Sequence, residues 1–150
     1  MNNDKVISTL NGLIETCKDG EEGFRTAAEG LTDPQTRSEF QNYSRDRGQM
    51  AHELQAEVRR LGGDPDKAGS MSGAIHRGWI NIKSVVTGKD DGSIISEAER
   101  GEDAAKKAYD HAISSGLSGA ALALVQQQRA RVHSTHDRVR ALEKATTPSR

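Results

Sequence analysis

The chain has 150 residues, of which 21 are basic and 22 acidic, so its formal net charge at pH 7 is −1. This length fits one domain spanning 1–150 with a real hydrophobic core, and the balanced charge argues against nucleic acid or an anionic membrane as a partner. The one cysteine, Cys17, excludes an intramolecular disulfide, and no leader-like or membrane-length apolar run is present, so the sequence predicts a cytoplasmic protein.

Two long helices are predicted in the first half of the chain. Apolar residues recur every three or four positions over about 4–30, with one gap at Gly20 and Glu21. Cys17 falls on this apolar stripe and is expected to be a small core residue. A second stripe runs over 34–61, where the preceding aspartate is a suitable N-cap and a proline fits the first helical position. The two stripes predict an antiparallel helical hairpin.

A turn-rich crossover over 62–92 contains one short amphipathic segment. In this segment Ile75, Trp79 and Ile82 share an apolar face. The face either covers the bundle or forms the interface of a homo-oligomer, and the sequence leaves both alternatives open.

Two further helices are predicted over 93–115 and 118–145, with Gly116 ending the first of them. No strand pattern competes, because strict alternation of apolar and polar residues does not persist. Two helical hairpins joined by a long crossover define an all-α four-helix bundle. In such a bundle the second and third helices run parallel, as do the first and fourth.

Several polar residues interrupt the apolar stripes and are therefore expected to point inward. They are Glu21 with Glu22 beside it, Arg47, Glu102 with Glu99 beside it, Gln128, and His136. When the helices are aligned from their connecting turns, most of these residues fall at one level. The sequence therefore predicts a polar layer across the middle of the bundle.

Two interpretations of this layer stay open, besides a misassigned stripe. In the first, Arg47 neutralises the buried carboxylates, because buried charges persist when they are paired. In the second, the layer is a metal centre, because carboxylates and imidazole suit iron or manganese. The helices 34–61 and 118–145 lack the Glu-x-x-His pattern that ferritin-like dimetal sites take from two helices, and an arginine cannot ligate a metal. The candidate ligands are Glu22, Glu53, Glu99, Glu102 and His136.

The segments "ELQAEVRRLGGDP", "HRGWINIKSVVTG" and "ERGEDAAKKAYDHAI" resemble bacterial four-helix-bundle proteins of unknown function within the ferritin-like superfamily. The resemblance extends over about 4–144 and implies a ferritin-like bundle. It also implies Glu21 or Glu22, Glu99 or Glu102, and His136 as the counterparts of the superfamily's metal ligands. The ligand pair of the second helix has no counterpart, since Arg47 and Met50 hold the inward positions.

From these observations we expect a non-catalytic bundle that is structural, partner-binding or stress-associated and needs no cofactor. The alternative is a di-iron or manganese carboxylate protein, which would act as a metal-dependent oxidase. A third hypothesis is a homo-oligomer assembled through Ile75, Trp79 and Ile82.

Overall fold

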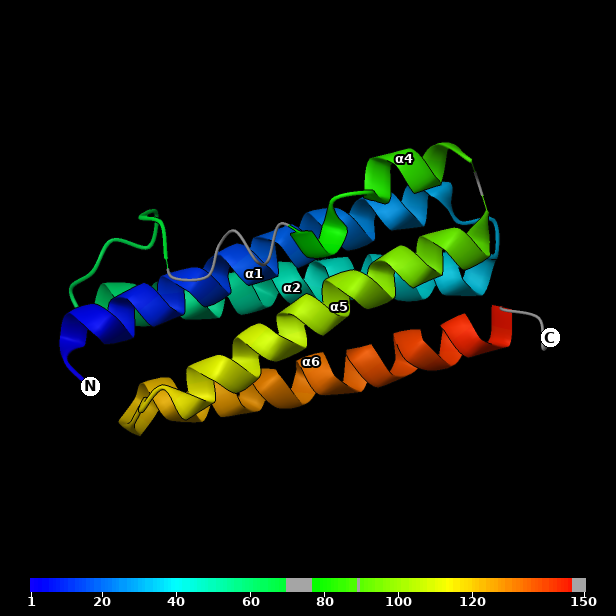
Figure 1. Ribbon diagram of the computed structural model, residues 1–150. Helices are drawn as coiled ribbons and strands as arrows, with labels where there is room; N and C mark the ends of the chain where they lie inside the picture. The colour runs from blue at the N-terminus through cyan, green and yellow to red at the C-terminus, as the bar shows by residue number, and fades with distance from the viewer. Residues whose placement is uncertain (70–76, 89, 147–150) are drawn as a thin grey trace.

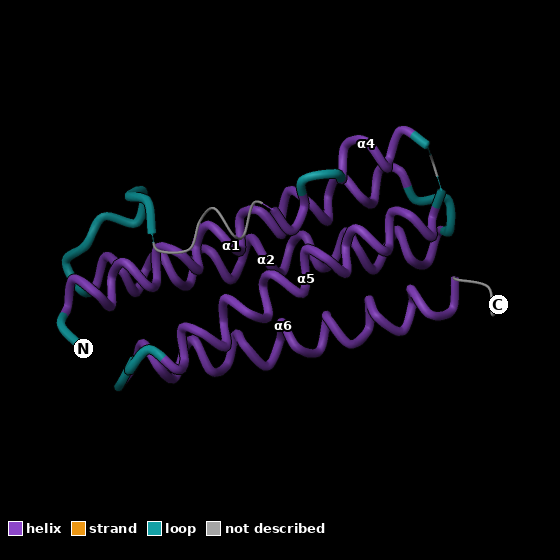
Figure 2. Tube along the Cα trace, viewed as in Figure 1, coloured by secondary structure: helices purple, strands orange, loops and turns teal. Residues whose placement is uncertain are grey.

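A computed structural model describes residues 1–69, 77–88 and 90–146 of the chain. Helices are the regular secondary structure of these residues and are joined by loops and turns, as Figure 2 shows. The elements in chain order are α1 (Asn3–Gly30), α2 (Pro34–Arg60), a 3-10 turn (Arg77–Trp79), α4 (Ile82–Thr87), α5 (Asp91–Ser114) and α6 (Gly119–Thr146).

The four long helices form a bundle of two antiparallel hairpins, α1–α2 and α5–α6 (Figure 1). The crossover runs back along the bundle, so α2 is parallel to α5 and α1 is parallel to α6. The short helix α4 lies outside this bundle, where it contacts α1 and α5. The predicted all-α bundle with one long crossover is thereby confirmed.

The helix ends follow local capping chemistry. Asp33 accepts a hydrogen bond from the backbone N–H of Thr36 at 2.9 Å, as expected for the N-cap of α2. Asp90 caps α5 in the same way, so α5 begins at Asp91, two residues before the predicted start. Gly62 has a φ of 84°, a conformation that favours glycine and ends α2.

The buried apolar residues form two separate clusters. One, which contains Leu10, Cys17 and Tyr109, fills the end of the bundle near the start of α1. The other fills the end near the α1–α2 turn and is built around Phe24 and Phe40, whose ring centroids lie 5.2 Å apart. A polar layer separates the two clusters and contains Gly20, Arg47, Glu102 and His136, one residue from each long helix.

Trp79 of the crossover packs into the bundle between α1 and α5. A Cβ atom on Gly23 would lie 2.3 Å from the indole, and one on Gly101 would lie 2.2 Å from it, so the ring fits only because both positions are glycine. Trp79 and Ile82 are 8% and 6% exposed, which shows that this part of the crossover covers the bundle. Ile75 lies outside the described residues.

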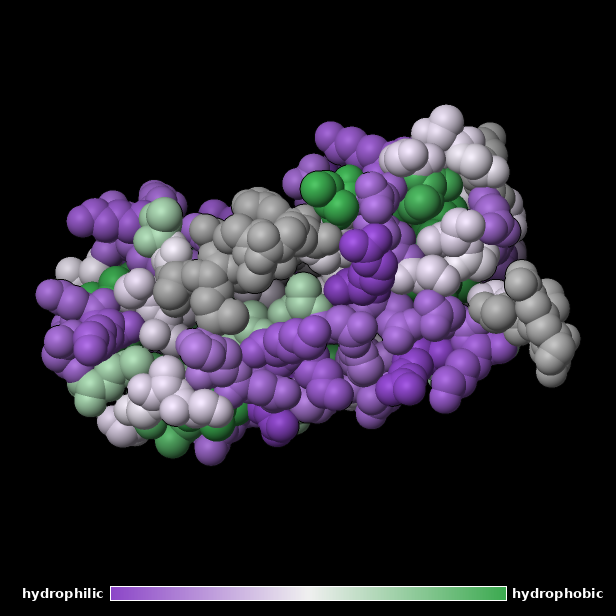
Figure 3. All heavy atoms as spheres, viewed as in Figure 1, coloured by the Kyte–Doolittle hydropathy of each residue, from purple (hydrophilic) through white to green (hydrophobic). Residues whose placement is uncertain are grey.

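Ion pairs join α2 and α6. The acidic residues Glu39, Asp46 and Glu53 are spaced seven residues apart on α2, and arginines on α6 face them. Arg138 binds Glu39 at 2.8 Å, while Arg131 binds both Asp46 and Glu53. The face drawn in Figure 3 is mainly hydrophilic along the middle of α5 and α6, with hydrophobic patches beside α4 and at the α5–α6 turn. Among the described residues, no helix combines the length and the apolar character needed to cross a membrane.

Candidate functional site

The centre of the polar layer is a buried ion pair between α2 and α5. Arg47 Nη2 lies 2.6 Å from Glu102 Oε2, and the two side chains are 2% and 0% exposed. Gly20 of α1 makes room for the guanidinium, because a Cβ at this position would lie 3.1 Å from Arg47 Nη1. The guanidinium carbon also lies 5.5 Å from the centre of the Phe24 ring, within the range of a cation–π contact.

The guanidinium of Arg47 keeps its charge in this pair. Burial by itself lowers the pKa of Arg47, but the charge of Glu102 and its hydrogen bond outweigh burial and raise that pKa above its ordinary value. The predicted acid–base pairing in the layer is therefore confirmed for Arg47 and Glu102.

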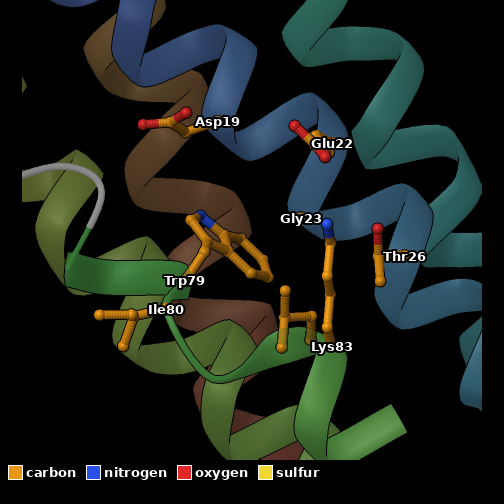
Figure 4. A pocket seen from close by; sticks show the side chains of 8 residues that line it. Asp19, Glu22, Gly23, Thr26, Trp79, Ile80 and Lys83 are labelled. Atoms are coloured by element: carbon orange, nitrogen blue, oxygen red, sulfur yellow. The ribbon is translucent and has the colours of Figure 1, made fainter. Parts of the chain in front are cut away.

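The inward placement predicted for Glu21 and Glu22 is wrong. Both side chains are exposed, because Gly20 holds the inward position and each further residue turns about 100° around the helix. Glu21 lies over Gly48 of α2, where a Cβ atom would come within 2.4 Å of its Oε2. Glu22 lies beside the crossover, at the rim of a cleft that Trp79 also lines (Figure 4).

Glu53 is half-buried and belongs to a different hydrogen-bond network. Its Oε1 accepts from Gln128 Nε2 at 2.9 Å and from Arg131 Nη1 at 3.3 Å. Gln128 is fully buried and accepts the hydroxyl hydrogen of Tyr109 at 2.7 Å. The structure therefore places Glu53 with Gln128 and Arg131, and not with the Arg47–Glu102 pair.

The same network reaches Cys17, whose Sγ lies 3.1 Å from the Tyr109 hydroxyl. Cys17 is 0% exposed, and burial raises the pKa of its thiol to about 11, so the reactive thiolate is scarce at neutral pH. The predicted core position of Cys17 is confirmed.

We therefore expect Cys17 to stay unlabelled by Ellman's reagent at pH 8 while the protein is folded, since the thiol is both covered and protonated. Labelling should appear with increasing urea, in parallel with the loss of helical circular dichroism. Complete labelling of the folded protein within minutes would contradict this placement.

His136 and Glu99 meet on the side of the layer that faces the α5–α6 seam. His136 is 3% exposed, and its Nε2 lies 2.6 Å from Asp103 Oδ1. The carboxyl group of Glu143 hydrogen-bonds Glu99 and, together with burial, raises the pKa of Glu99 to about 7. One donor atom from each of Glu99, Asp103 and His136 lies within 4.8 Å of the others. The predicted proximity of Glu99 and His136 is thus confirmed.

Asp103 was not among the candidate residues predicted from the sequence. It follows Glu99 by four positions on α5, and residues at this spacing lie on the same face of a helix. This spacing could have identified Asp103 as a neighbour of Glu99. It was missed because Asp103 lies beside the apolar stripe and does not interrupt it.

The polar layer does not fit a ferritin-like dimetal centre. Such a centre takes carboxylates from all four helices and histidines from two of them. Among the described residues of the polar layer, Glu102 is the one carboxylate, and the guanidinium of Arg47 already binds it. An arginine carries no donor for a metal ion, so the interior is built for an ion pair.

The four-helix architecture with one long crossover places the protein in the class of ferritin-like bundles. One solved structure similar to this chain is a two-domain protein from Anabaena variabilis that contains DJ-1/ThiJ/PfpI-like and ferritin-like domains. The match has a TM-score of 0.81 at 18% identity and covers 100% of this chain and 42% of that chain.

The chain belongs to the family described as domain of unknown function (DUF2383), whose model matches residues 5–115. No curated protein matches the sequence. Family membership and fold agree with the resemblance that the sequence motifs predicted.

The homo-oligomer interface proposed for the crossover stays a prediction. Trp79 and Ile82 face the bundle and Ile75 lies outside the described residues, but their neighbour Ile80 is 67% exposed and offers an apolar side chain to such an interface. Sedimentation of the wild type and of Ile80→Ser tests this hypothesis: a dimer that the substitution dissociates supports the interface, and two monomers contradict it.

Proposed function

We propose that the protein is a non-catalytic ferritin-like bundle with a structural or partner-binding role. The observation that carries this proposal is the Arg47–Glu102 ion pair, which lies in the bundle interior, the region in which ferritin-like proteins assemble a dimetal centre. A di-iron or manganese oxidase is the alternative, and the donor set of the layer does not support it.

Two observations support a partner-binding role. In the similar protein from Anabaena variabilis, a ferritin-like domain is joined to a second domain, so a bundle of this kind works there alongside another folded unit. The present chain also has a cleft of about 350 Å³ between α1 and the crossover (Figure 4). Its lining combines apolar Trp79 and Ile82 with charged Glu22 and Lys83, and a tryptophan with polar residues around it matches the apolar core and polar rim of a protein interface.

Metal analysis tests the proposal. We expect the wild type and Glu102→Gln, both purified from medium rich in iron and manganese, to contain equal amounts of either metal, because Glu102 holds an arginine and not a metal ion. Oxygen consumption after addition of ferrous iron should also be equal in the two proteins. Glu29→Gln, which changes an exposed carboxylate of α1, serves as the control.

Near-stoichiometric iron or manganese in the wild type that is lost in Glu102→Gln would refute the proposal. Faster oxygen consumption by the wild type than by Glu102→Gln would refute it as well.

A further inference from the structure

A second group of ligand-type side chains lies in the α5–α6 seam, separate from the central ion pair. Its members are Glu99 and Asp103 of α5 and His136 of α6. One donor atom of each residue lies within 4.8 Å of the donor atoms of the other two. Metal–ligand bonds of about 2.0–2.2 Å place neighbouring donors roughly 3 Å apart. Small side-chain rotations would therefore bring all three donors onto one cation.

The imidazole of His136 is already oriented as a metal ligand requires. Its ring is 3% exposed and directs Nε2 toward Asp103, while Nδ1 lies 3.4 Å from Asp137 Oδ1. A ligating histidine typically uses one nitrogen for the metal and donates the other N–H to a carboxylate. In this protein Asp137 provides that carboxylate.

The charge of the group also favours a cation. Glu143 hydrogen-bonds Glu99, so the carboxyl groups of Glu99, Asp103, Glu143 and Asp137 surround one imidazole. A bound dication would relieve the repulsion between these carboxylates.

A second histidine–carboxylate pair on α5 and α6 has a different environment from the Glu99–Asp103–His136 group. His133 Nε2 lies 3.1 Å from Asp110 Oδ1, but Arg129 Nε also binds this oxygen at 2.5 Å. An arginine therefore neutralises Asp110, and no third acidic ligand completes a group there among the described residues. The Glu99–Asp103–His136 group has the additional carboxylate, and no arginine in the described part of the chain pairs with its members.

We propose that the α5–α6 seam binds one divalent transition-metal cation through Glu99, Asp103 and His136. An imidazole nitrogen combined with carboxylate oxygens suits Zn²⁺, Mn²⁺ or Fe²⁺. The site takes its ligands from two helices and leaves the Arg47–Glu102 pair intact, so it is independent of the proposed function.

Calorimetric titration of untagged, chelator-treated protein with ZnCl₂ tests this site. We expect the wild type to bind one Zn²⁺ per chain, and Asp103→Asn and Glu99→Gln each to weaken binding by about tenfold or more. Asp103 is 49% exposed, so its substitution should leave the fold intact, and circular dichroism checks this. Asp137→Asn should weaken binding by about tenfold through the orientation of the imidazole.

Two control variants test whether Zn²⁺ binding is specific to the α5–α6 seam. Asp110→Asn should bind Zn²⁺ as tightly as the wild type, which excludes general binding to surface histidines. Glu102→Gln should also bind normally, which separates this site from a centre in the polar layer. The proposal is overturned if the wild type shows no saturable binding, if Asp103→Asn and Glu99→Gln bind as tightly as the wild type, or if Asp110→Asn or Glu102→Gln weakens binding equally.

Discussion

Replacing Glu102 with alanine is expected to lower the free energy of unfolding by about 3–5 kcal/mol. The substitution leaves the guanidinium of Arg47 without its carboxylate partner at a position that is 2% exposed. Alanine offers no acceptor to the guanidinium, so a buried charge loses its partner. Urea denaturation followed by circular dichroism at 222 nm measures the effect.

Two comparisons identify the cause of this loss. The double substitution Arg47→Met with Glu102→Leu removes both charges, so it should recover most of the stability that Glu102→Ala loses. Glu57→Ala breaks the Arg60–Glu57 pair, in which Arg60 is 58% exposed, and should cost about 1 kcal/mol or less. If the double variant were as unstable as Glu102→Ala, lost packing rather than an unpaired charge would account for the loss.

Replacing Gly101 with alanine is expected to displace the indole of Trp79 from the bundle. The new Cβ would lie 2.2 Å from the ring, far inside van der Waals contact, and the ring is too rigid to yield locally. Overpacking of this kind costs about 1–3 kcal/mol. Trp79 is the single tryptophan of the chain, so a red shift of its fluorescence reports the displacement directly.

Gly92→Ala is the matched control for this experiment. Gly92 also lies in α5, but a Cβ there would meet no atom closer than 3.9 Å. We expect this variant to keep the wild-type emission spectrum and to be slightly more stable, because alanine favours the helix over glycine. A Gly101→Ala protein with unchanged emission and stability would show that Trp79 is not held between the two glycines.

The period of the apolar residues was enough to predict the four long helices and the inward direction of Arg47 and Glu102. Both side chains interrupt stripes that are otherwise apolar, and burial of a charge is tolerated where a partner is present. The sequence thus favoured a buried acid–base network over a metal centre, and the structure contains its Arg47–Glu102 part but not Glu21.

The gap in the stripe of α1 led to a wrong prediction for a physical reason. The apolar period assigns the inward position to Glu21 and its neighbour, since a carboxylate there interrupts the pattern. The inward residues are Gly20 and Gly23, which have no side chain and accommodate Arg47 and Trp79 from other elements. The apolar period identifies inward positions by their large apolar side chains. It therefore misses inward glycines that make room for a side chain from another element.

The seams between helices were the least predictable part of the candidate site. Glu53 turns toward Gln128 and Arg131, whereas Asp103 and Glu143 join the group around His136. These contacts depend on how far each helix is rotated about its own axis. Moving by one residue along a helix turns the side-chain direction by about 100°. An apolar stripe several residues wide does not define the rotation of the helix this closely.

The division of the core into two apolar blocks determines how the helices align along the bundle. Alanine-rich faces such as that of α5 would otherwise slide easily past a neighbour. A slip of one turn, about 5.4 Å, would bring Arg47 level with Ala98 or Ala105, both buried in the apolar clusters. Such a slip would separate two buried charges at once. The Arg47–Glu102 pair therefore fixes the axial register of α2 and α5.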